Sequence, residues 1–360
     1  MKTMYLKKQL RLIALLLIVS NLAGWAGEMD VSKKKEINQS FNVEPNDLLN
    51  VDNRYGSITV TYWDKNEVNI RVVVESKGSN ERRAQEGLDM VQIELKKVAN
   101  TVYGTTSIKT SIGNNSIWGN NNKLVIDYYI SMPRKFVASL SQKYGNINLP
   151  GHNEVKYTLE VKYGNLKAGS FTQPLAIDAG YSNVILEDVA RLDLEAKYCG
   201  NVSLGSGTDI RIDGQYSQFK LRNAAKLDID NSYGNITAET INNFSAHIRY
   251  GAANIDVLKE RLSARQLDYS SLTIKELDAN FGSIDAEARY STLKLSVSPQ
   301  AAFRINAESM KYGNVEIKGL RITSSDVEDK VDYYYQINGG GNKTIHFEGN
   351  NYSSLKINAL

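Results

Sequence analysis

Residues 157–168 read YTLEVKYGNLKA, and residues 227–238 read LDIDNSYGNITA. In each stretch apolar residues alternate with polar ones up to a tyrosine. A small residue and a second alternating apolar pair then follow. Alternation with a period of two is typical of a β-strand that buries one face. Each stretch therefore predicts two strands joined by a bend at the tyrosine.

The same pattern recurs along most of the chain. Each copy of the pattern has one tyrosine at its bend, which we call the template tyrosine. From Tyr144 to Tyr269 these tyrosines are spaced 19, 18, 17, 18, 17, 17 and 19 residues apart, and later copies are irregular. Phe281 fits the template as a shorter variant. A period near 18 residues favours a repeat architecture. The twelve template tyrosines are Tyr55, Tyr144, Tyr163, Tyr181, Tyr198, Tyr216, Tyr233, Tyr250, Tyr269, Tyr290, Tyr312 and Tyr352.

The repeat predicts an all-β fold, a parallel β-helix (β-solenoid) with coils of 17–19 residues. Parallel stacking would place successive tyrosines about 4.8 Å apart in an aromatic column beside a ladder of asparagines. The alternative is an antiparallel meander, in which equivalent tyrosines would lie about 9.6 Å apart. The glycine that often follows the tyrosine, such as Gly164, is expected to permit the bend. The rings are expected to cover the corner of the core, with a sugar-stacking platform as the less favoured interpretation.

The chain predicts three segments. Residues 1–26 have the pattern of a signal peptide, with basic residues before an apolar run and small residues Gly24 and Ala26 at the cleavage site. An uncleaved N-terminal anchor is the alternative. Residues 27–135 are expected to form a β-rich region with a helix near 80–91, capped by Asn80. Residues 136–360 are expected to form the solenoid.

Charge and cysteine content narrow the class of protein. The chain has 43 basic and 40 acidic residues. The leader holds four of the basic residues and no acid, so residues 27–360 have 39 against 40, a net charge of −1. This balance predicts neither a nucleic-acid nor an anionic-membrane partner. No later stretch is apolar for long enough to span a membrane. Cys199 is the single cysteine, so an internal disulfide is impossible.

Three stretches resemble a known family: NVDNRYGSITVTYWDKNEV at 50–68, ISMPRKFVASLSQKYGNINLPG at 130–151, and the serial copies of VKYGNLKAGS. They resemble bacterial secreted proteins called "putative adhesins", a domain of unknown function, over most of the chain after the leader. The resemblance implies a parallel β-helix and an exported protein of the periplasm or the cell surface. It implies no catalytic residues.

Motifs for catalysis are missing from the sequence. The three histidines lie in different copies without metal-ligand spacing. No nucleophile elbow, P-loop or dinucleotide fingerprint is present. The chain is therefore expected not to be an enzyme and to need no cofactor.

One set of charged residues stands out when the copies are aligned. The residue three before each tyrosine is expected to face outward, and five successive copies have an acid there: Glu160, Asp178, Glu195, Asp213 and Asp230. Asp52 and Glu287 occupy this place in outlying copies. The residue just before the tyrosine is basic in seven copies: Arg54, Lys143, Lys162, Lys197, Arg249, Arg289 and Lys311.

Two interpretations of this acidic stripe remain open. It is either a solvated sheet face that discourages aggregation or a strip that contacts glycans or a divalent cation. The residue just before the tyrosine is Gly180 in one copy and Gln215 in another, and neither is basic. The nearby carboxylates have the fewest cations beside them, so if the strip binds Ca²⁺ the expected ion site is Asp178, Glu195 and Asp213.

The function that the sequence favours is a non-catalytic extracytoplasmic scaffold, an adhesin-like protein that presents a repetitive polar face to glycan or cell-envelope partners. A structural, assembly or sensing role in the cell envelope is the first alternative. A polysaccharide-active enzyme is the second, because Asp193 and Asp228 lie two residues before Glu195 and Asp230.

Overall fold

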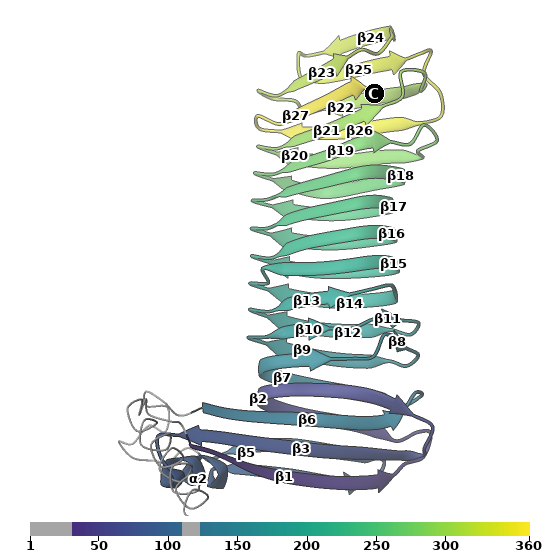
Figure 1. The fold of residues 1–360 in the computed structure, drawn as a ribbon. Helices are drawn as coiled ribbons and strands as arrows, with labels where there is room; N and C mark the ends of the chain where they lie inside the picture. Colours follow the sequence, from purple (N-terminus) through teal and green to yellow (C-terminus); the bar gives the residue numbers. More distant parts are fainter. Residues whose placement is uncertain (1–30, 110–122) are drawn as a thin grey trace, which may run out of the picture. The chain divides into compact units, whose positions relative to one another are not determined.

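The computed structural model describes residues 31–109 and 123–360, and this part of the chain is all-β, with 27 strands and one helix (Figure 1). The predicted signal peptide, residues 1–26, lies outside the described residues. The described residues form two compact units. The smaller comprises 31–36, 73–92, 107–109 and 123–125, and the larger comprises 37–72, 93–106 and 126–360.

The smaller unit contains the predicted helix, α2 (Glu81–Asp89). Asn80 caps it, because its side-chain oxygen accepts a hydrogen bond from the backbone N–H of Arg83 at 2.9 Å. The helix buries Ala84 and Leu88. The helix prediction is therefore confirmed. Within the described residues, no helix is both long and apolar enough to cross a membrane.

The described chain begins with seven long strands. Their alternating burial patterns show one inward and one outward side chain per pair of residues, as strands require. The strands are β1 (Val31–Asn42), β2 (Leu48–Trp63), β3 (Glu67–Gly78), β4 (Val91–Val98), β5 (Thr101–Ile108), β6 (Lys123–Pro133) and β7 (Val137–Asn148).

In the larger unit, β2 is already the first repeat of the stack. It pairs in parallel with β7, from Leu48 opposite Val137 to Thr59 opposite Asn148. On its other edge it pairs in parallel with β5 and β6. Residues 48–63 are thus continuous with the repeats after residue 136. The 135/136 boundary does not coincide with the division into compact units.

The regular repeats follow one another in parallel register. Each strand pairs with the strand one period later, as in Ile177 opposite Leu194, and this holds from β7 to β21. The predicted parallel stacking is confirmed there, and the antiparallel meander is excluded. These strands are β8 (His152–Asn153), β9 (Tyr157–Lys162), β10 (Asn165–Lys167), β11 (Ser170–Phe171), β12 (Leu175–Gly180), β13 (Asn183–Leu186), β14 (Val189–Lys197), β15 (Asn201–Gln215), β16 (Gln218–Ser232), β17 (Asn235–Arg249), β18 (Ala252–Asp268), β19 (Ser271–Leu277), β20 (Ser283–Arg289) and β21 (Thr292–Val297).

The last repeats are stacked out of chain order. Strands β26 and β27 pair in parallel with β20 and β21 on one edge and with β22 and β23 on the other. Strand β25 pairs antiparallel with both β22 and β24. In Figure 1 the yellow β27 accordingly lies among green strands. The bounds are β22 (Phe303–Glu308), β23 (Asn314–Lys318), β24 (Ile322–Glu328), β25 (Asp332–Ile337), β26 (Thr344–Asn350) and β27 (Ser354–Ala359).

The core of the larger unit consists of columns of inward-facing side chains. Equivalent positions such as Leu194, Ile212 and Ile229 are 0–1% exposed. Phe281 belongs to this core, where its ring packs edge-on against Phe303 at 5.8 Å. It is not a variant of the template tyrosine, so that prediction was wrong.

Candidate binding surface

The bend of each repeat is made by the tyrosine itself. All twelve template tyrosines have left-handed backbone, with φ between 49° and 62°. The glycines that follow them, such as Gly145 and Gly164, are not among the described residues with positive φ. The expectation that glycine supplies the bend was therefore wrong. Left-handed backbone costs a residue other than glycine roughly 1–2 kcal/mol, so each repeat needs a compensating interaction.

Glycine at the next position serves close approach instead. A Cβ on Gly164 would lie 1.7 Å from the carbonyl oxygen of Gly145 in the preceding repeat. Other repeats have a buried serine or Cys199 there. The Ser217 hydroxyl lies within hydrogen-bonding distance of the carbonyls of Ala196 and Gln215 and accepts the N–H of Cys199 at 3.0 Å. Either way, the bends of successive repeats are held against each other.

The twelve tyrosine rings form one continuous column. From Tyr55 to Tyr290 neighbouring ring centroids are 4.7–5.1 Å apart, with planes inclined by 3–14°. Tyr352 and then Tyr312 continue it at 5.9 and 5.1 Å. The predicted aromatic column is confirmed. Stacked aromatic pairs contribute about 0.5–1.5 kcal/mol each, so the one pair that each repeat adds offsets a large part of the backbone cost of the bend.

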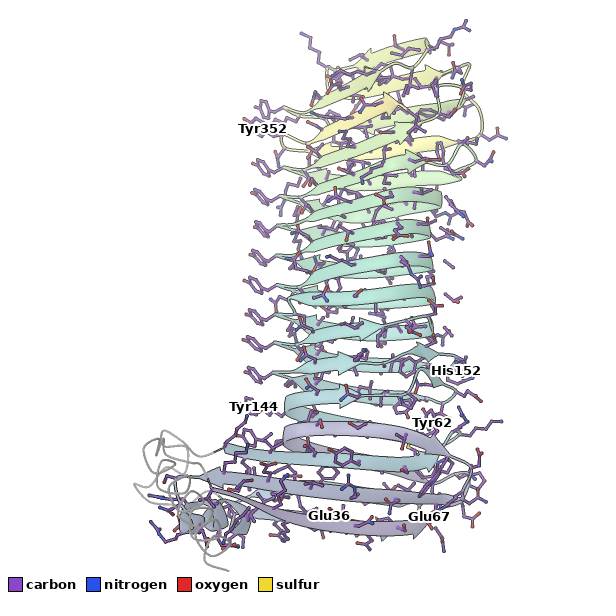
Figure 2. All side chains as sticks on the ribbon, in the orientation of Figure 1. Glu36, Tyr62, Glu67, Tyr144, His152 and Tyr352 are labelled. Carbon is purple, nitrogen blue, oxygen red and sulfur yellow. The ribbon has the colours of Figure 1, made fainter. Side chains whose placement is uncertain are left out.

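The column lies outside the core. From Tyr144 onward the template tyrosines are 42–67% exposed, and Figure 2 shows Tyr144 and Tyr352 projecting from the bends. The expectation that the rings cover the corner of the core was wrong. Each inner ring has both faces covered by its neighbours, so only ring edges and hydroxyls meet solvent. Because sugars stack on ring faces, the inner tyrosines offer no sugar-stacking platform.

The predicted acidic stripe is assembled by the parallel register. Asp178 lies opposite Glu160 and Glu195, and Asp213 lies opposite Glu195 and Asp230. All five side chains face outward and are partly or fully exposed. We call Glu160, Asp178, Glu195, Asp213 and Asp230 the acidic column. Ser141 separates Asp52 from this column, and His247 and Gln266 come between it and the repeat of Glu287.

Most carboxylates of the acidic column have cationic partners. Lys162 contacts both Glu160 at 2.8 Å and Asp178 at 3.2 Å. Lys197 pairs with Glu195 and Arg249 with Asp230. Among the described residues, Asp213 alone of the five makes no ion pair. Of the three residues expected to bind an ion, Asp178 and Glu195 are thus compensated. Lys162 reaches Asp178 from the preceding repeat, beside Gly180, and Lys197 pairs with Glu195 on its own strand.

The electrostatics of the column follow from these pairs. The hydrogen bond from Lys162, helped by the Ser141 hydroxyl, lowers the pKa of Glu160 despite partial burial. The same contact raises the pKa of Lys162. Burial raises the pKa of Asp52. No cluster of three or more metal-ligating side chains occurs in residues 31–109 and 123–360. The surface therefore has the character of a ribbon of paired charges.

The two aspartates that suggested an enzyme are not brought together. Asp193 and Asp228 both lie opposite Arg211, one on each side of it. They are therefore two levels apart, with a cation between them. They form no pair with each other, but each still lies two residues before a carboxylate of the acidic column, Glu195 or Asp230, on the same strand. The polysaccharide-active alternative therefore stays a hypothesis.

Sequence reasoning missed a second group on the same face. Asp268 replaces a basic residue just before Tyr269 and lies in register between Arg249 and Arg289. It is only 7% exposed. The only sequence signal was the spacing of 19 residues between Tyr250 and Tyr269, which follows two spacings of 17.

Comparisons with known proteins give distant likenesses only. No protein-family model and no curated protein matches the chain. A "putative cell adhesion protein" from Clostridium sporogenes is 13% identical, with a TM-score of 0.17, and 91% of this chain aligns with 100% of that one. A "putative adhesin" from Bacteroides fragilis is 11% identical, with a TM-score of 0.21, at 90% and 98% coverage. A "putative lipid binding protein" from Parabacteroides distasonis is 13% identical, with a TM-score of 0.27, at 72% and 94% coverage. Likeness at this level supports no conclusion about function.

Proposed function

We propose that this chain is an exported, non-catalytic parallel β-helix, an adhesin-like scaffold that presents its repetitive polar face to glycans of the cell envelope or of another surface. The observation that supports this most directly is the acidic column, in which five successive repeats place a carboxylate at the same outward position. Lysine and arginine side chains accompany it on the same face.

The spacing explains why such a face suits a glycan. Parallel repeats place equivalent acceptors about 4.8 Å apart, with cationic donors between them. A glycan offers hydroxyls along its whole length, which can donate to the carboxylates and accept from the ammonium groups. Once one sugar unit is bound, the next units are held close to their own contacts, so several weak contacts to one extended ligand together give a higher affinity. A flat, repetitive face can therefore bind without a deep pocket.

The state of the carboxylates favours binding over catalysis. A general acid at neutral pH needs a raised pKa, usually from burial. The pKa of Glu160 is lowered by Lys162 instead. Each carboxylate of the column except Asp213 already accepts an ion pair or hydrogen bond from a cationic side chain.

A glycan array tests the proposal. The purified chain is compared with the triple variant Asp178→Asn, Glu195→Gln, Asp213→Asn, which keeps the size of each side chain. Asp256→Asn is the matched control. Asp256 is an exposed carboxylate of β18 that pairs with Lys275 of β19, and it lies after the bend at Tyr250, outside the acidic column. We expect the array signal to fall in the triple variant alone. Equal signals from wild type and triple variant would refute the role of the acidic column.

An assembly role in the envelope is the second candidate. All seven residues of β24 are exposed, and this strand pairs with β25. An exposed strand can add a strand from another chain. The test is a pull-down from envelope fractions with wild type and Ser324→Pro, since proline removes an N–H donor from the strand. A specific partner lost in that variant, together with a silent glycan array, would favour this role.

A further inference from the structure

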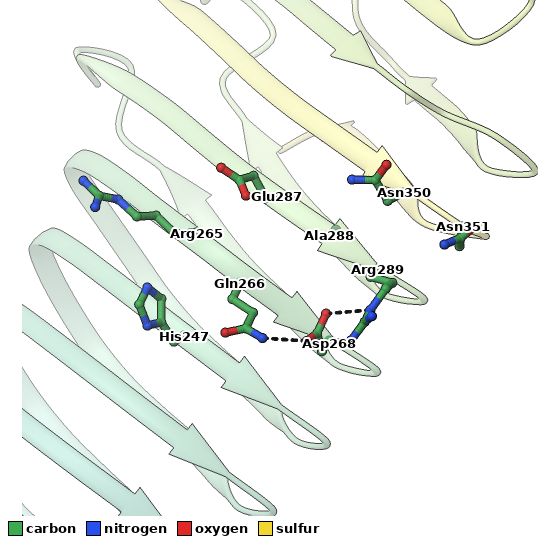
Figure 3. A pocket seen from close by; sticks show the side chains of 9 residues that line it. All are labelled: His247, Arg265, Gln266, Asp268, Glu287, Ala288, Arg289, Asn350 and Asn351. Atoms are coloured by element: carbon green, nitrogen blue, oxygen red, sulfur yellow. Dashed lines mark hydrogen bonds and ion pairs between the residues drawn. The ribbon is translucent and has the colours of Figure 1, made fainter.

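A hollow of about 610 Å³ opens on the outward face of the repeats beyond the acidic column. His247, Arg265, Gln266, Glu287 and Arg289 are among the residues that line it (Figure 3). A second hollow of about 530 Å³ shares Arg265 and Glu287 with the first. The two hollows therefore adjoin at Arg265 and Glu287, and we call them together the β18 groove.

The groove lies at a β-bulge in β18. Between Ser245 and His247 on β17 there is one residue, whereas between their partners Ser263 and Gln266 on β18 there are two. The pairing of β18 with β20 shows the same shift, between Ala264 and Leu267. A bulge re-aims side chains and locally interrupts the flat face of a sheet. Here Arg265 and Gln266 both line the groove from adjacent positions.

Asp268 organises the donors at one end of the groove. Its carboxylate accepts from Nε and Nη2 of Arg289 at 3.2 and 3.1 Å and from the side-chain amide of Gln266 at 2.7 Å. Figure 3 shows both donors converging on it. Asp268 is almost fully buried, and it orients both donors in the absence of a ligand. Asp268 is thus a positioning residue.

Arg265 is the residue that this arrangement leaves available. It is exposed, it lines both hollows, and it makes no ion pair or side-chain hydrogen bond among the described residues. A guanidinium group recognises a carboxylate through two parallel hydrogen bonds. An anionic group of this planar shape is therefore the expected partner of Arg265.

The rest of the groove is suited to hydroxyl groups. Ser245, Ser263 and Ser283 line the second hollow, and the carboxylate of Glu287 lines both. Arg261, Asp285 and His346 complete the polar lining of the second hollow. These groups can donate to and accept from sugar hydroxyls, whereas the apolar lining side chains are alanines. The span from Arg261 to Asp268 covers about 20 Å of strand, which is long enough for a short oligosaccharide.

We infer that the β18 groove binds a carboxylated oligosaccharide, an oligouronate, with Arg265 holding a sugar carboxylate and Glu287 and the serines holding its hydroxyls. This inference rests on the proposed glycan-binding function and assigns it a second site with a defined ligand class. It differs from the acidic column, where five carboxylates share three lysine and arginine partners.

Titration calorimetry with the purified full chain tests the inference. The probes are oligomers of galacturonic, glucuronic, mannuronic and guluronic acid, each compared with its methyl ester, which lacks the negative charge. We expect at least one acid to bind more tightly than its ester. We expect Arg265→Ala to weaken that binding about tenfold or more, because a charge-assisted bidentate contact is lost. Arg265→Lys should fall between the two, since charge without the planar fork restores only part of the contact.

Two further variants keep the result decisive. Lys275→Ala removes an exposed cation from β19, outside the groove, and should leave the affinity unchanged. Gln266→Ala removes one donor held by Asp268 and should weaken binding while the melting temperature stays the same. Equal affinity of Arg265→Ala and wild type, or equal affinity for acid and ester, overturns the inference.

The outcomes separate this inference from the proposed function. If the array detects neutral glycans and no uronate binds, the groove inference fails and the glycan-binding function stands. The same conclusion follows if uronate binding is lost in the acidic-column triple variant and retained in Arg265→Ala. If neither the array nor calorimetry detects any glycan, both proposals fail.

Discussion

The ring of Tyr352 lies between the rings of Tyr290 and Tyr312, at 5.9 and 5.1 Å, although it is the last of the three in the chain. This order arises because β26 and β27 fill the level between β20–β21 and β22–β23. The C-terminal strands therefore pair on both edges.

Removing residues 344–360 is expected to unfold more than the segment removed. Ile345, Phe347, Leu355 and Ile357 are all 0% exposed, and each buried side chain of this size contributes about 1.5–3 kcal/mol. Strands β22 and β23 would also lose their parallel partners. We expect new proteolytic cleavage between residues 298 and 343, with the earlier repeats intact. Deleting exposed Leu360 alone is the control, and equal protease resistance of the two truncations would contradict this prediction.

Substitution of Tyr216 separates ring stacking from backbone strain. Its ring stacks on Tyr198 and Tyr233 at 4.9 and 4.8 Å, and its φ is 52°. Tyr216→Phe keeps both ring contacts and should leave the urea midpoint nearly unchanged. Tyr216→Ala should lower the free energy of unfolding by about 1–3 kcal/mol, because two stacked contacts are lost and the strain remains. Tyr216→Gly should lose less, since glycine adopts this backbone freely. A lower free energy of unfolding for Tyr216→Gly than for Tyr216→Ala would contradict the argument from backbone strain.

Two glycines test the close approach of successive bends. Gly164→Ala would place a methyl group 1.7 Å from a backbone oxygen, and we expect a loss of about 1–3 kcal/mol or more. Gly200 also follows a template bend, yet its Cβ would meet no atom nearer than Asn183 Oδ1 at 3.8 Å. Gly200→Ala should therefore be tolerated. Thermal melts of the two variants measure the difference, and similar melting temperatures would count against the role assigned to Gly164.

A buried asparagine marks a position where the fold can be made more stable. Asn231 is 0% exposed, and neither polar atom of its side chain has a hydrogen-bond partner in the part of the chain that the structure describes. Ala196 occupies the equivalent place two repeats earlier. Asn231→Ala should therefore raise the free energy of unfolding by about 1 kcal/mol, because an unsatisfied buried polar group costs about 1–3 kcal/mol.

Asn53 provides the matched comparison for Asn231. It also lies two residues before a template tyrosine and is 0% exposed, but it is bonded to Ile126, Gln142 and Thr106. Asn53→Ala should lower the free energy of unfolding, because three partners lose their contact. Urea denaturation of both variants checks the opposite signs. Destabilisation by Asn231→Ala as large as that by Asn53→Ala would show that this interpretation of Asn231 is wrong.

The pair of Glu160 and Lys162 predicts a pH dependence of stability. The folded-state pKa of Glu160 is lowered from its usual 4.5. A lowered carboxyl pKa contributes stability above the unfolded-state value, which is lost as the pH falls through the folded-state value. The melting temperature of wild type should exceed that of Glu160→Gln at pH 7, and the difference should shrink below pH 4.5. Glu276→Gln, an exposed carboxylate without an ion pair in the described residues, is the control. A difference independent of pH would rule out this contribution.

Local patterns predicted the regular repeats well. Alternation gave the inward columns of Leu194 and Ile212, and the constant distance between tyrosines predicted parallel register. The pattern could not show which residue adopts left-handed backbone, because glycine is the usual choice and the compensating ring stack exists only between repeats. The prediction placed Phe281 at a bend, whereas it lies in the core. In an irregular copy the position of a single aromatic residue does not distinguish the two.

The candidate site was predicted in part. The parallel register alone assembles the acidic column. In each repeat the residue three positions before the tyrosine has the same outward place, so equal spacing aligns these residues. The partners were not predictable, because Lys162 reaches Asp178 across a strand boundary. The β18 groove depends on one extra residue in a strand, which interrupts the pairing with both neighbours.

The amino-acid sequence by itself determined the period, the alternation of buried and exposed positions and the place of each bend, because these follow from contacts within one repeat and from its likeness to the next. Only the tertiary structure decided the order of repeats at the C-terminal end, the stacking of the tyrosines outside the core and the groove at the β18 bulge. Each of these depends on which segments, distant in the chain, share an edge, and that is settled by burial and backbone hydrogen bonding across the whole stack.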